Sequence, residues 1–296
     1  MKVERSVIRN DYRQKRSIST SQSPLPPYRG RVRALWILVG LGTLGAPAQA
    51  ETLRDFCPDR PGLGTPPCTI DPGHFDVEVG LADWTLDRAP DARTDTVQLG
   101  QLLVRIGLTE SLEAQLGWTA FGHVRTRDRA TGAVDKGSGV GDVTIALRQN
   151  LSNPDGSGFS VALMPYATLP TGNQVLGAGD WSAGVLVPLS YDLGETVQIG
   201  LTGRAEAAAD EDRDGHHLAY GGVAGISLSL SKALDATFEI SADRDEDPSG
   251  HSTQWLAGLS AGWMAKDDLQ LDAGVNIGLD ASAPDLELYV GVSRRF

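Results

Sequence analysis

The feature that most constrains this chain is an alternation of apolar and polar residues that runs to its last residue. One side of the stretch 286–296 carries Leu286, Leu288, Val290, Val292, Arg294 and Phe296, and the other carries Glu287, Tyr289, Gly291, Ser293 and Arg295. Successive side chains of a β-strand point to opposite faces. The stretch therefore predicts a strand with one apolar face and one polar face.

The same alternation returns through most of the chain. It is clearest at 75–81, 102–108, 112–119, 143–148, 197–204, 234–241 and 269–279, and it is weaker in segments that start near 159, 181, 217 and 253. These segments indicate about 12 strands of roughly 10–13 residues, which is the length that crosses a bilayer when a strand is tilted.

The connections between these segments sort by length. Short ones lie at 109–111, 153–158, 194–195, 231–233 and 265–267, and they alternate with mostly longer, more acidic ones at 88–93, 125–137, 169–180, 209–216 and 244–252. A soluble β-sandwich gives no reason for this order, whereas an outer-membrane barrel has short periplasmic turns and long outer loops. We expect an all-β fold, a transmembrane antiparallel up-and-down β-barrel with both ends of the domain on the periplasmic side.

The polar faces of the predicted strands carry charges. The candidates for the lumen are Arg105, Glu113, Asp142, Arg148, Arg204, Glu206, Glu239 and Asp272. A charge facing lipid at mid-depth costs about 2–4 kcal/mol, so these residues belong in the interior. Two interpretations stay open: a constriction that orients a small solute, or interior salt bridges that close the barrel.

The start of the chain has the pattern of a secretory signal. Three arginines (Arg29, Arg31, Arg33) precede a short apolar run at 34–46, and a small-residue site ends at Ala50. The run is shorter than the roughly 20 residues of a spanning helix. We expect residues 1–50 to be a signal peptide with a long lead-in, rather than a buried core helix.

The mature chain begins with residues 51–73, which are rich in Pro, Gly and Asp and show no periodicity. We interpret them as an irregular periplasmic arm that enters the lumen or hangs below it, ahead of the barrel at 74–296. Secretion places Cys57 and Cys68 in an oxidising compartment, so they are expected to form a disulfide.

Charge excludes one class of partner. Residues 1–50 hold 9 of the 26 basic and 2 of the 38 acidic side chains, so the remainder has 17 basic against 36 acidic residues, a net charge of −19. Such a chain is not expected to bind nucleic acid.

Two features could carry chemistry in the outer loops. Asp210, Asp212 and Asp214 match the first half of a calcium loop, but position 221, where the bidentate Glu belongs, is Gly. The alternatives are weak divalent-cation binding, to which His216 and His217 could contribute, and a solvated acidic loop. His123, placed by the alternation on the polar face, would be the base of a lipid-modifying enzyme, although the sequence pairs no serine with it. No enzyme activity and no cofactor is expected.

Four stretches carry a family resemblance: GHFDVEVG at 73–80, GVGDVTIALRQNL at 139–151, MPYATLPTG at 164–172 and APDLELYVGVSRRF at 283–296. They resemble the outer-membrane barrels catalogued under the meta-pathway of phenol degradation, whose members are usually labelled transporters. The resemblance implies a protein of the cell outer membrane, in contact with its lipid, that passes small solutes, with aromatic or hydrophobic ones as candidates. The alternatives are a structural or binding barrel without transport and, less favoured, the lipid-modifying enzyme. Tyr289, Gly291 and Phe296 of the last strand are expected to be the signal that the barrel assembly machinery recognises.

Overall fold

The structure is a computed structural model that describes residues 53–296. The predicted signal peptide lies outside the described residues. Among the described residues, no helix is long and apolar enough to cross a membrane.

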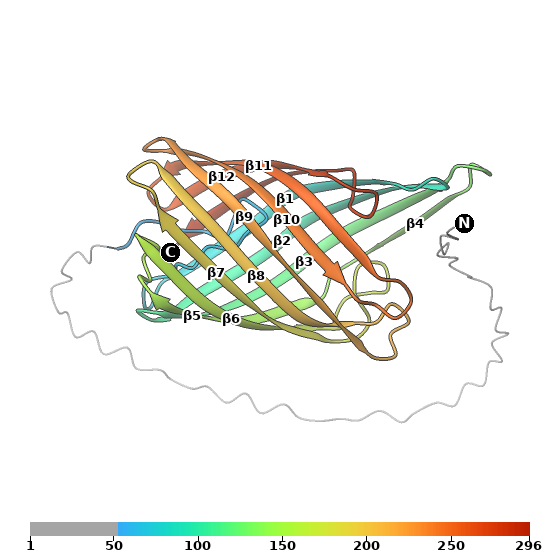
Figure 1. Ribbon diagram of the computed structural model, residues 1–296, viewed down its shortest axis with the longest axis horizontal. Coiled ribbons are helices and arrows are strands. Elements are labelled where there is room, and N and C mark those ends of the chain that lie inside the picture. The colour runs from blue at the N-terminus through green and yellow to red at the C-terminus, as the bar shows by residue number, and fades with distance from the viewer. Residues whose placement is uncertain (1–52) are drawn as a thin grey trace, which may run out of the picture. The chain divides into compact units, whose positions relative to one another are not determined.

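Thirteen β-strands make up one antiparallel sheet (Figure 1). They are β1 (Phe75–Arg88), β2 (Ala92–Thr109), β3 (Leu112–Asp128), β4 (Val134–Gly139), β5 (Val143–Ser152), β6 (Phe159–Leu169), β7 (Ser182–Asp192), β8 (Val197–Ala209), β9 (His216–Ser231), β10 (Leu234–Asp245), β11 (Ser252–Lys266), β12 (Leu269–Gly278) and β13 (Leu286–Arg295). β4 pairs with the outer part of β3 and β5 with its inner part, so these two short strands share one position in the wall. The wall is therefore that of the predicted barrel, with twelve strands.

The sheet closes on itself between its first and last strands. β1 pairs with β13 from Asp76↔Arg295 to Leu86↔Leu286. At the end of this seam, Phe75 and Phe296 exchange two backbone hydrogen bonds of 3.2 and 2.8 Å, and their rings stack with centroids 4.9 Å apart. Closure leaves no strand edge with unpaired backbone groups, and a sheet in lipid must meet this condition.

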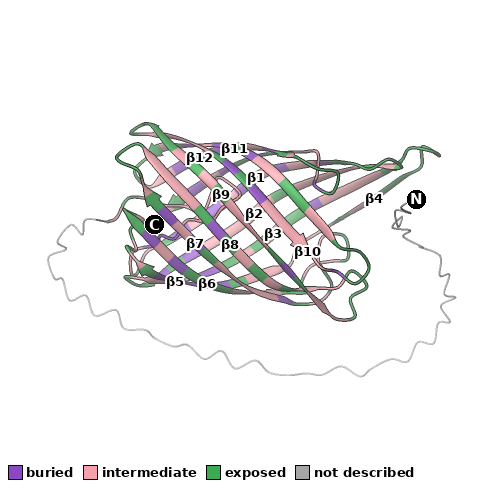
Figure 2. Ribbon diagram, viewed as in Figure 1, coloured by how far each residue is buried: buried purple, intermediate pink, exposed green. Residues whose placement is uncertain are grey.

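The barrel has the polarity of a membrane protein rather than of a soluble one. Its outer wall exposes large apolar side chains such as Leu116, Ile145 and Leu259, while Arg105 and Arg148 are completely buried (Figure 2). Apolar residues facing out and charged residues facing in are stable when the outside solvent is lipid. None of the eight candidate lumen residues is exposed; seven of them lie in strands, whereas Asp142 lies between β4 and β5.

Two of the predicted outer loops are largely strand. β1 extends to Arg88 and β2 begins at Ala92, and β3 continues to Asp128, where β4 pairs with it from Gly122↔Gly139 to Arg127↔Val134. These strands project beyond the others at the loop end (Figure 1). The prediction of a long loop at 125–137 is wrong because backbone pairing continues past the apolar belt, where polar residues on both faces hide the alternation.

Candidate functional site

The amino-terminal arm (residues 53–73) has no strand and lies inside the barrel, in contact with the lumen side chains of several strands. A disulfide between Cys57 and Cys68 closes a loop within it. Of the two positions that the sequence left open for the arm, the structure shows the one in the lumen.

A buried ion cluster anchors the arm to β1, β2, β3 and β5; it consists of Asp59, Glu78, Arg105, Glu113 and Arg148. Arg105 donates from Nε and Nη2 to the two carboxylate oxygens of Glu113 at 3.0 and 3.1 Å. Arg148 donates from Nη2 to Asp59 Oδ2 at 2.7 Å. Both arginines also donate to the carbonyl oxygen of Cys68, at 3.2 and 3.0 Å. The side chains of both arginines, Glu78 and Glu113 are 0% exposed.

Glu78 on β1 binds the backbone of the arm. Its two carboxylate oxygens accept hydrogen bonds of 2.8 Å from the N–H groups of Asp59 and Arg60. Breaking a buried pair by removing one partner leaves the other charge without compensation, at a cost of about 3–5 kcal/mol. The buried ion cluster is therefore a rigid attachment.

A second attachment lies on β12 and β13. Arg60 donates to both oxygens of Asp272, at 3.2 and 2.9 Å, and its guanidinium lies over the ring of Tyr289 at 5.4 Å from the centroid. A Cβ at Gly291 would collide with the same guanidinium. Tyr289 and Gly291 thus form the surface that receives Arg60, a role that the sequence did not indicate. Their part in assembly stays a prediction.

The arm touches the opposite wall through residues 62–65, which we call the gate segment. Glu239 on β10 accepts hydrogen bonds from the N–H groups of Leu63 and Gly64, at 2.7 and 2.9 Å. Thr202 on β8 bonds the backbone of Thr65, accepting from its N–H at 3.0 Å and donating to its carbonyl at 3.2 Å. A Cβ at Gly64 would lie 2.9 Å from Glu239 Oε1, so a larger residue there would displace the carboxylate.

The remaining predicted lumen residues lie apart from the buried ion cluster. Arg204 pairs with Glu206 at 3.2 Å and with Asp243 at 2.8 Å. Asp142 accepts from the N–H groups of Gly172 and Ala178, at 2.7 and 2.8 Å, and so shapes the β6–β7 loop. Arg105, Arg148 and Arg204 thus form interior ion pairs, with Arg204 paired apart from the other two. Whether these charges also orient a solute stays a prediction.

Beside the arm lies a cavity of about 460 Å³, lined by the arm and by side chains of β7, β8, β9 and β10 among others. Its charged lining is acidic, with Asp59, Asp192, Glu195, Asp235 and Glu239 against the single basic residue Arg60. Hydroxyl and amide groups such as Ser190, Thr237 and Gln198 fill much of the rest. The opening left in the lumen is thus polar and negatively charged.

The acidic outer loop differs from the predicted calcium loop. Asp210 faces His217 and, across a second loop, Asp247, whereas Asp212 and Asp214 are exposed and bond within their own turn. The three aspartates predicted from spacing therefore do not converge on one ion, because Asp210 turns toward a neighbouring loop.

His123 lies on the opposite face from the one predicted. The alternation breaks in both strands at the facing pair Gly100 (φ +67°) and Ala120, without a shift in their register, so Gly122 faces the loop residue Leu176 inside and His123 faces outward. There His123 Nδ1 lies 2.7 Å from Ser138 Oγ of β4. The sequence does not pair this serine with His123, because the strand pairing of β3 with β4 brings the two together.

Sequence reasoning missed Asp59, Arg60 and Glu78. Glu78 could have been found, because the sequence places this acid on the polar face of a predicted strand. Asp59 and Arg60 carried none, since an arm without periodicity does not show which wall it will contact.

Twelve antiparallel strands, closed into a cylinder with an apolar outer wall and a charged interior, define an outer-membrane β-barrel. No curated protein sequence matches the chain. The family described as "Putative MetA-pathway of phenol degradation" matches residues 58–296, and the chain belongs to this family.

Solved structures with a similar fold are distant in sequence. The KdgM porin in complex with disordered oligogalacturonate is 9% identical, with a TM-score of 0.47 over 75% of this chain and 99% of that chain. The NanC porin is 10% identical, with a TM-score of 0.46 over 74% and 98%. The translocator domain of the autotransporter NalP from Neisseria meningitidis is 15% identical, with a TM-score of 0.44 over 76% and 88%.

Proposed function

We propose that the protein is an outer-membrane channel for small neutral or cationic solutes, and that the gate segment of its arm controls the channel. The observation that carries this proposal is the acidic cavity between the arm and β7–β10. A polar space of this size in a barrel lumen suits passage of a small solute.

The charge of the cavity supports the preference for neutral and cationic solutes. Five carboxylates line it against one guanidinium. That guanidinium is paired with Asp272, and Asp59 is paired with Arg148, so Asp192, Glu195, Asp235 and Glu239 give the cavity its negative charge. Clefts lined by one sign of charge raise the local concentration of the opposite sign and exclude like charge. Anions are therefore disfavoured.

A small aromatic molecule with a hydroxyl group fits the mixed lining. Phe56, Leu189 and Val223 offer apolar contacts, while Asp235 and Thr237 offer hydrogen-bond partners. Phenol has this chemistry, and as a neutral molecule at neutral pH it meets no repulsion. The family description, which refers to phenol degradation, agrees with this solute class.

The gate segment is the part of the arm best suited to move. Hydrogen bonds from three backbone N–H groups to Glu239 and Thr202 hold it to the far wall, whereas the buried ion cluster holds the rest of the arm. A typical hydrogen bond contributes only about 0.5–1.5 kcal/mol net, or about 1.5–3 kcal/mol to a charged group. Release of the gate segment would widen the cavity while the anchored side stays in place.

The test is conductance of the full mature chain in planar lipid bilayers, with the reversal potential measured under a KCl gradient. We expect discrete conductance steps and a reversal potential that shows cation preference. Absence of both conductance and solute uptake into liposomes would favour the non-transporting barrel, and a preference for anions would contradict the solute class proposed.

One observation favours a second candidate, a lipid-modifying activity. His123 and Ser138 form a hydrogen-bonded pair on the outer wall, where lipid and lipopolysaccharide lie. Among residues 53–296 this is the one hydrogen bond of the His123 side chain, so no described group orients the ring as a third partner would. Phospholipid hydrolysis by purified protein that disappears in His123→Ala would establish the activity; equal rates in both would remove this candidate.

We also propose that the closing strand is the assembly signal. Phe296 stacks on Phe75 at the seam, while Arg294 beside it is half exposed and pairs with Asp268 at 3.7 Å. Deletion of Phe296 should therefore lower the folded fraction in membranes more than Arg294→Tyr does. Heat-modifiable migration on gels measures that fraction, and the reverse order would show that the signal lies elsewhere.

A further inference from the structure

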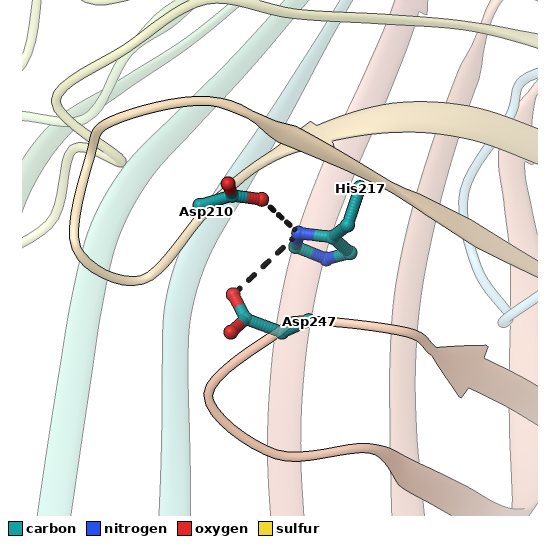
Figure 3. Close-up of side chains that lie close together, drawn as sticks. All are labelled: Asp210, His217 and Asp247. Carbon is teal, nitrogen blue, oxygen red and sulfur yellow. Dashed lines mark hydrogen bonds and ion pairs between the residues drawn. The ribbon is translucent and has the colours of Figure 1, made fainter.

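Two neighbouring outer loops meet at a compact group of side chains. The β8–β9 loop contributes Asp210, the start of β9 contributes His217, and the β10–β11 loop contributes Asp247. One potential ligand atom from each lies within 4.8 Å of the others. Figure 3 shows the imidazole of His217 between the two carboxylates.

We propose that Asp210, His217 and Asp247 bind a divalent cation of the zinc class and thereby join the two loops at the outer mouth of the barrel. The proposal is independent of whether the lumen conducts.

The imidazole is held in place by burial. The side chain of His217 is 6% exposed, and those of Asp210 and Asp247 are each 12% exposed. Nδ1 lies 2.8 Å from Asp210 Oδ1 and 3.5 Å from Asp247 Oδ2, so one nitrogen faces both carboxylates. A cation bound by these three atoms would take the place of a proton between them.

The second ring nitrogen of His217 also lies near a carboxylate, as the second nitrogen of metal-binding histidines usually does. Nε2 is buried without a hydrogen bond, although Asp245 Oδ1 lies 2.9 Å away, off the direction of the N–H. Histidines that bind metals usually donate their other N–H to a carboxylate, which fixes the ring. A small rotation of the imidazole would align Nε2–H with Asp245 while Nδ1 turns to the cation.

The charge of the group favours a cation. Three aspartates surround one imidazole, and within residues 53–296 no arginine or lysine lies within ion-pair distance of Asp210, Asp245 or Asp247. The carboxylates of this group therefore have the imidazole as their only possible cationic partner among the described residues.

The backbone preorganises the two loops. Glu211 donates its N–H to Asp247 Oδ2 at 2.8 Å, and Ser249 donates its hydroxyl to Glu211 at 2.8 Å. Gly215 has a φ of +136°, and a Cβ there would lie 2.5 Å from Asp210 Oδ2. The ligands are thus brought together by contacts that do not depend on the cation.

The donor set selects the class of ion. One imidazole nitrogen with two carboxylates suits Zn²⁺, and three protein ligands leave a fourth position for water. Calcium prefers six to eight oxygen ligands, often including a bidentate carboxylate, and magnesium retains most of its waters. We expect Zn²⁺ to bind far more tightly than Ca²⁺ or Mg²⁺.

Isothermal titration calorimetry with ZnCl₂ tests the proposal on the folded mature chain without a polyhistidine tag. We expect one ion per chain and no displacement by millimolar Ca²⁺. His217→Ala should weaken binding at least about tenfold, the scale on which metal sites respond to a lost partner. Asp247→Asn should do so too, in case one variant fails to fold.

The matched controls are the neighbours that the site does not use. His216→Ala removes the adjacent histidine, which stacks on Trp181 instead, and Asp212→Asn removes an exposed acid of the same loop. Both should bind Zn²⁺ like wild type, and Co²⁺ should give an absorption band that depends on His217. No zinc binding by wild type, or equal binding by His217→Ala, would overturn the proposal.

Discussion

The two sides of the lumen hold the arm in different ways. Toward β1, β2, β3 and β5, the buried ion cluster joins arm and wall through charges that are shielded from solvent. Toward β7–β10, hydrogen bonds from Leu63, Gly64 and Thr65 meet the wall beside an open polar cavity. The difference supports the proposed roles of the arm, as an anchor along one edge and a movable element along the other.

The largest expected effect is a difference in the free energy of unfolding between variants on the two sides of the lumen. Arg148→Met leaves Asp59 and Glu113 without one of their partners, which should cost about 3–5 kcal/mol of unfolding free energy. Arg204→Met on the other side should cost at most about 1 kcal/mol, because the Arg204 side chain is 35% exposed and pairs with the similarly exposed Asp243. Urea unfolding of the folded barrel in lipid measures both.

A double variant controls this measurement. Asp59→Asn should recover part of the loss in Arg148→Met, since it removes the stranded charge. Equal losses for Arg148→Met and Arg204→Met would contradict the division of the lumen into an anchored side and a movable side.

A smaller effect concerns ion selectivity on the open side. Asp235→Asn removes one of the acids that line the cavity, so the reversal potential in a KCl gradient should shift toward zero. Asp91→Asn, an exposed acid at the tip of the β1–β2 hairpin, should leave it unchanged. A shift from Asp91→Asn alone would place the selectivity outside the lumen.

The smallest expected effect is a pH dependence in the stability of the β8–β9 and β10–β11 loops when no metal is bound. His217 lies three residues before Tyr220, an exposed aromatic of the outer wall, and the groups that face it are Asp210, Asp245 and Asp247. Burial acts to lower the pKa of His217, but the hydrogen bond with Asp210 and the charges of Asp245 and Asp247 raise it overall. Protonated His217 thus stabilises the loops fully below the ordinary pKa of 6.5, and this stabilisation is lost as pH rises through the raised value.

Hydrogen exchange measures this dependence in metal-free protein. Amides at 210–217 and 246–250 should be better protected at pH 5.5 than at pH 8.5, after correction for the intrinsic exchange rate. In His217→Ala the difference should disappear, and its persistence would contradict the assignment.

The fold was predictable because lipid outside and charge inside impose a period of two on every strand. Arg105 and Glu113 followed from that pattern, and so did closure by the strand that ends at Phe296. The pattern failed for His123, because the alternation breaks at Gly100 and Ala120 while the strand register continues. It also missed β4, whose residues Val134–Gly139 do not alternate between apolar and polar.

Only the strand residues of the candidate site were predictable from the sequence, and those of the arm were not. A strand residue such as Glu78 has a face that the sequence reveals, whereas Asp59 and Arg60 lie in an arm whose contacts depend on tertiary packing. The same limit explains the outer loops, since no local spacing pairs Asp210 with Asp247 of another hairpin.

The most direct test of the gate is a disulfide across the movable side. Thr65 and Thr202 contact each other, so Thr65→Cys combined with Thr202→Cys should join the gate segment to β8. We expect oxidised protein to lose conductance in planar bilayers and to regain it on reduction, while wild type and both single variants conduct under either condition. Full conductance in the oxidised double variant, with the cross-link verified by mass spectrometry, would contradict the account.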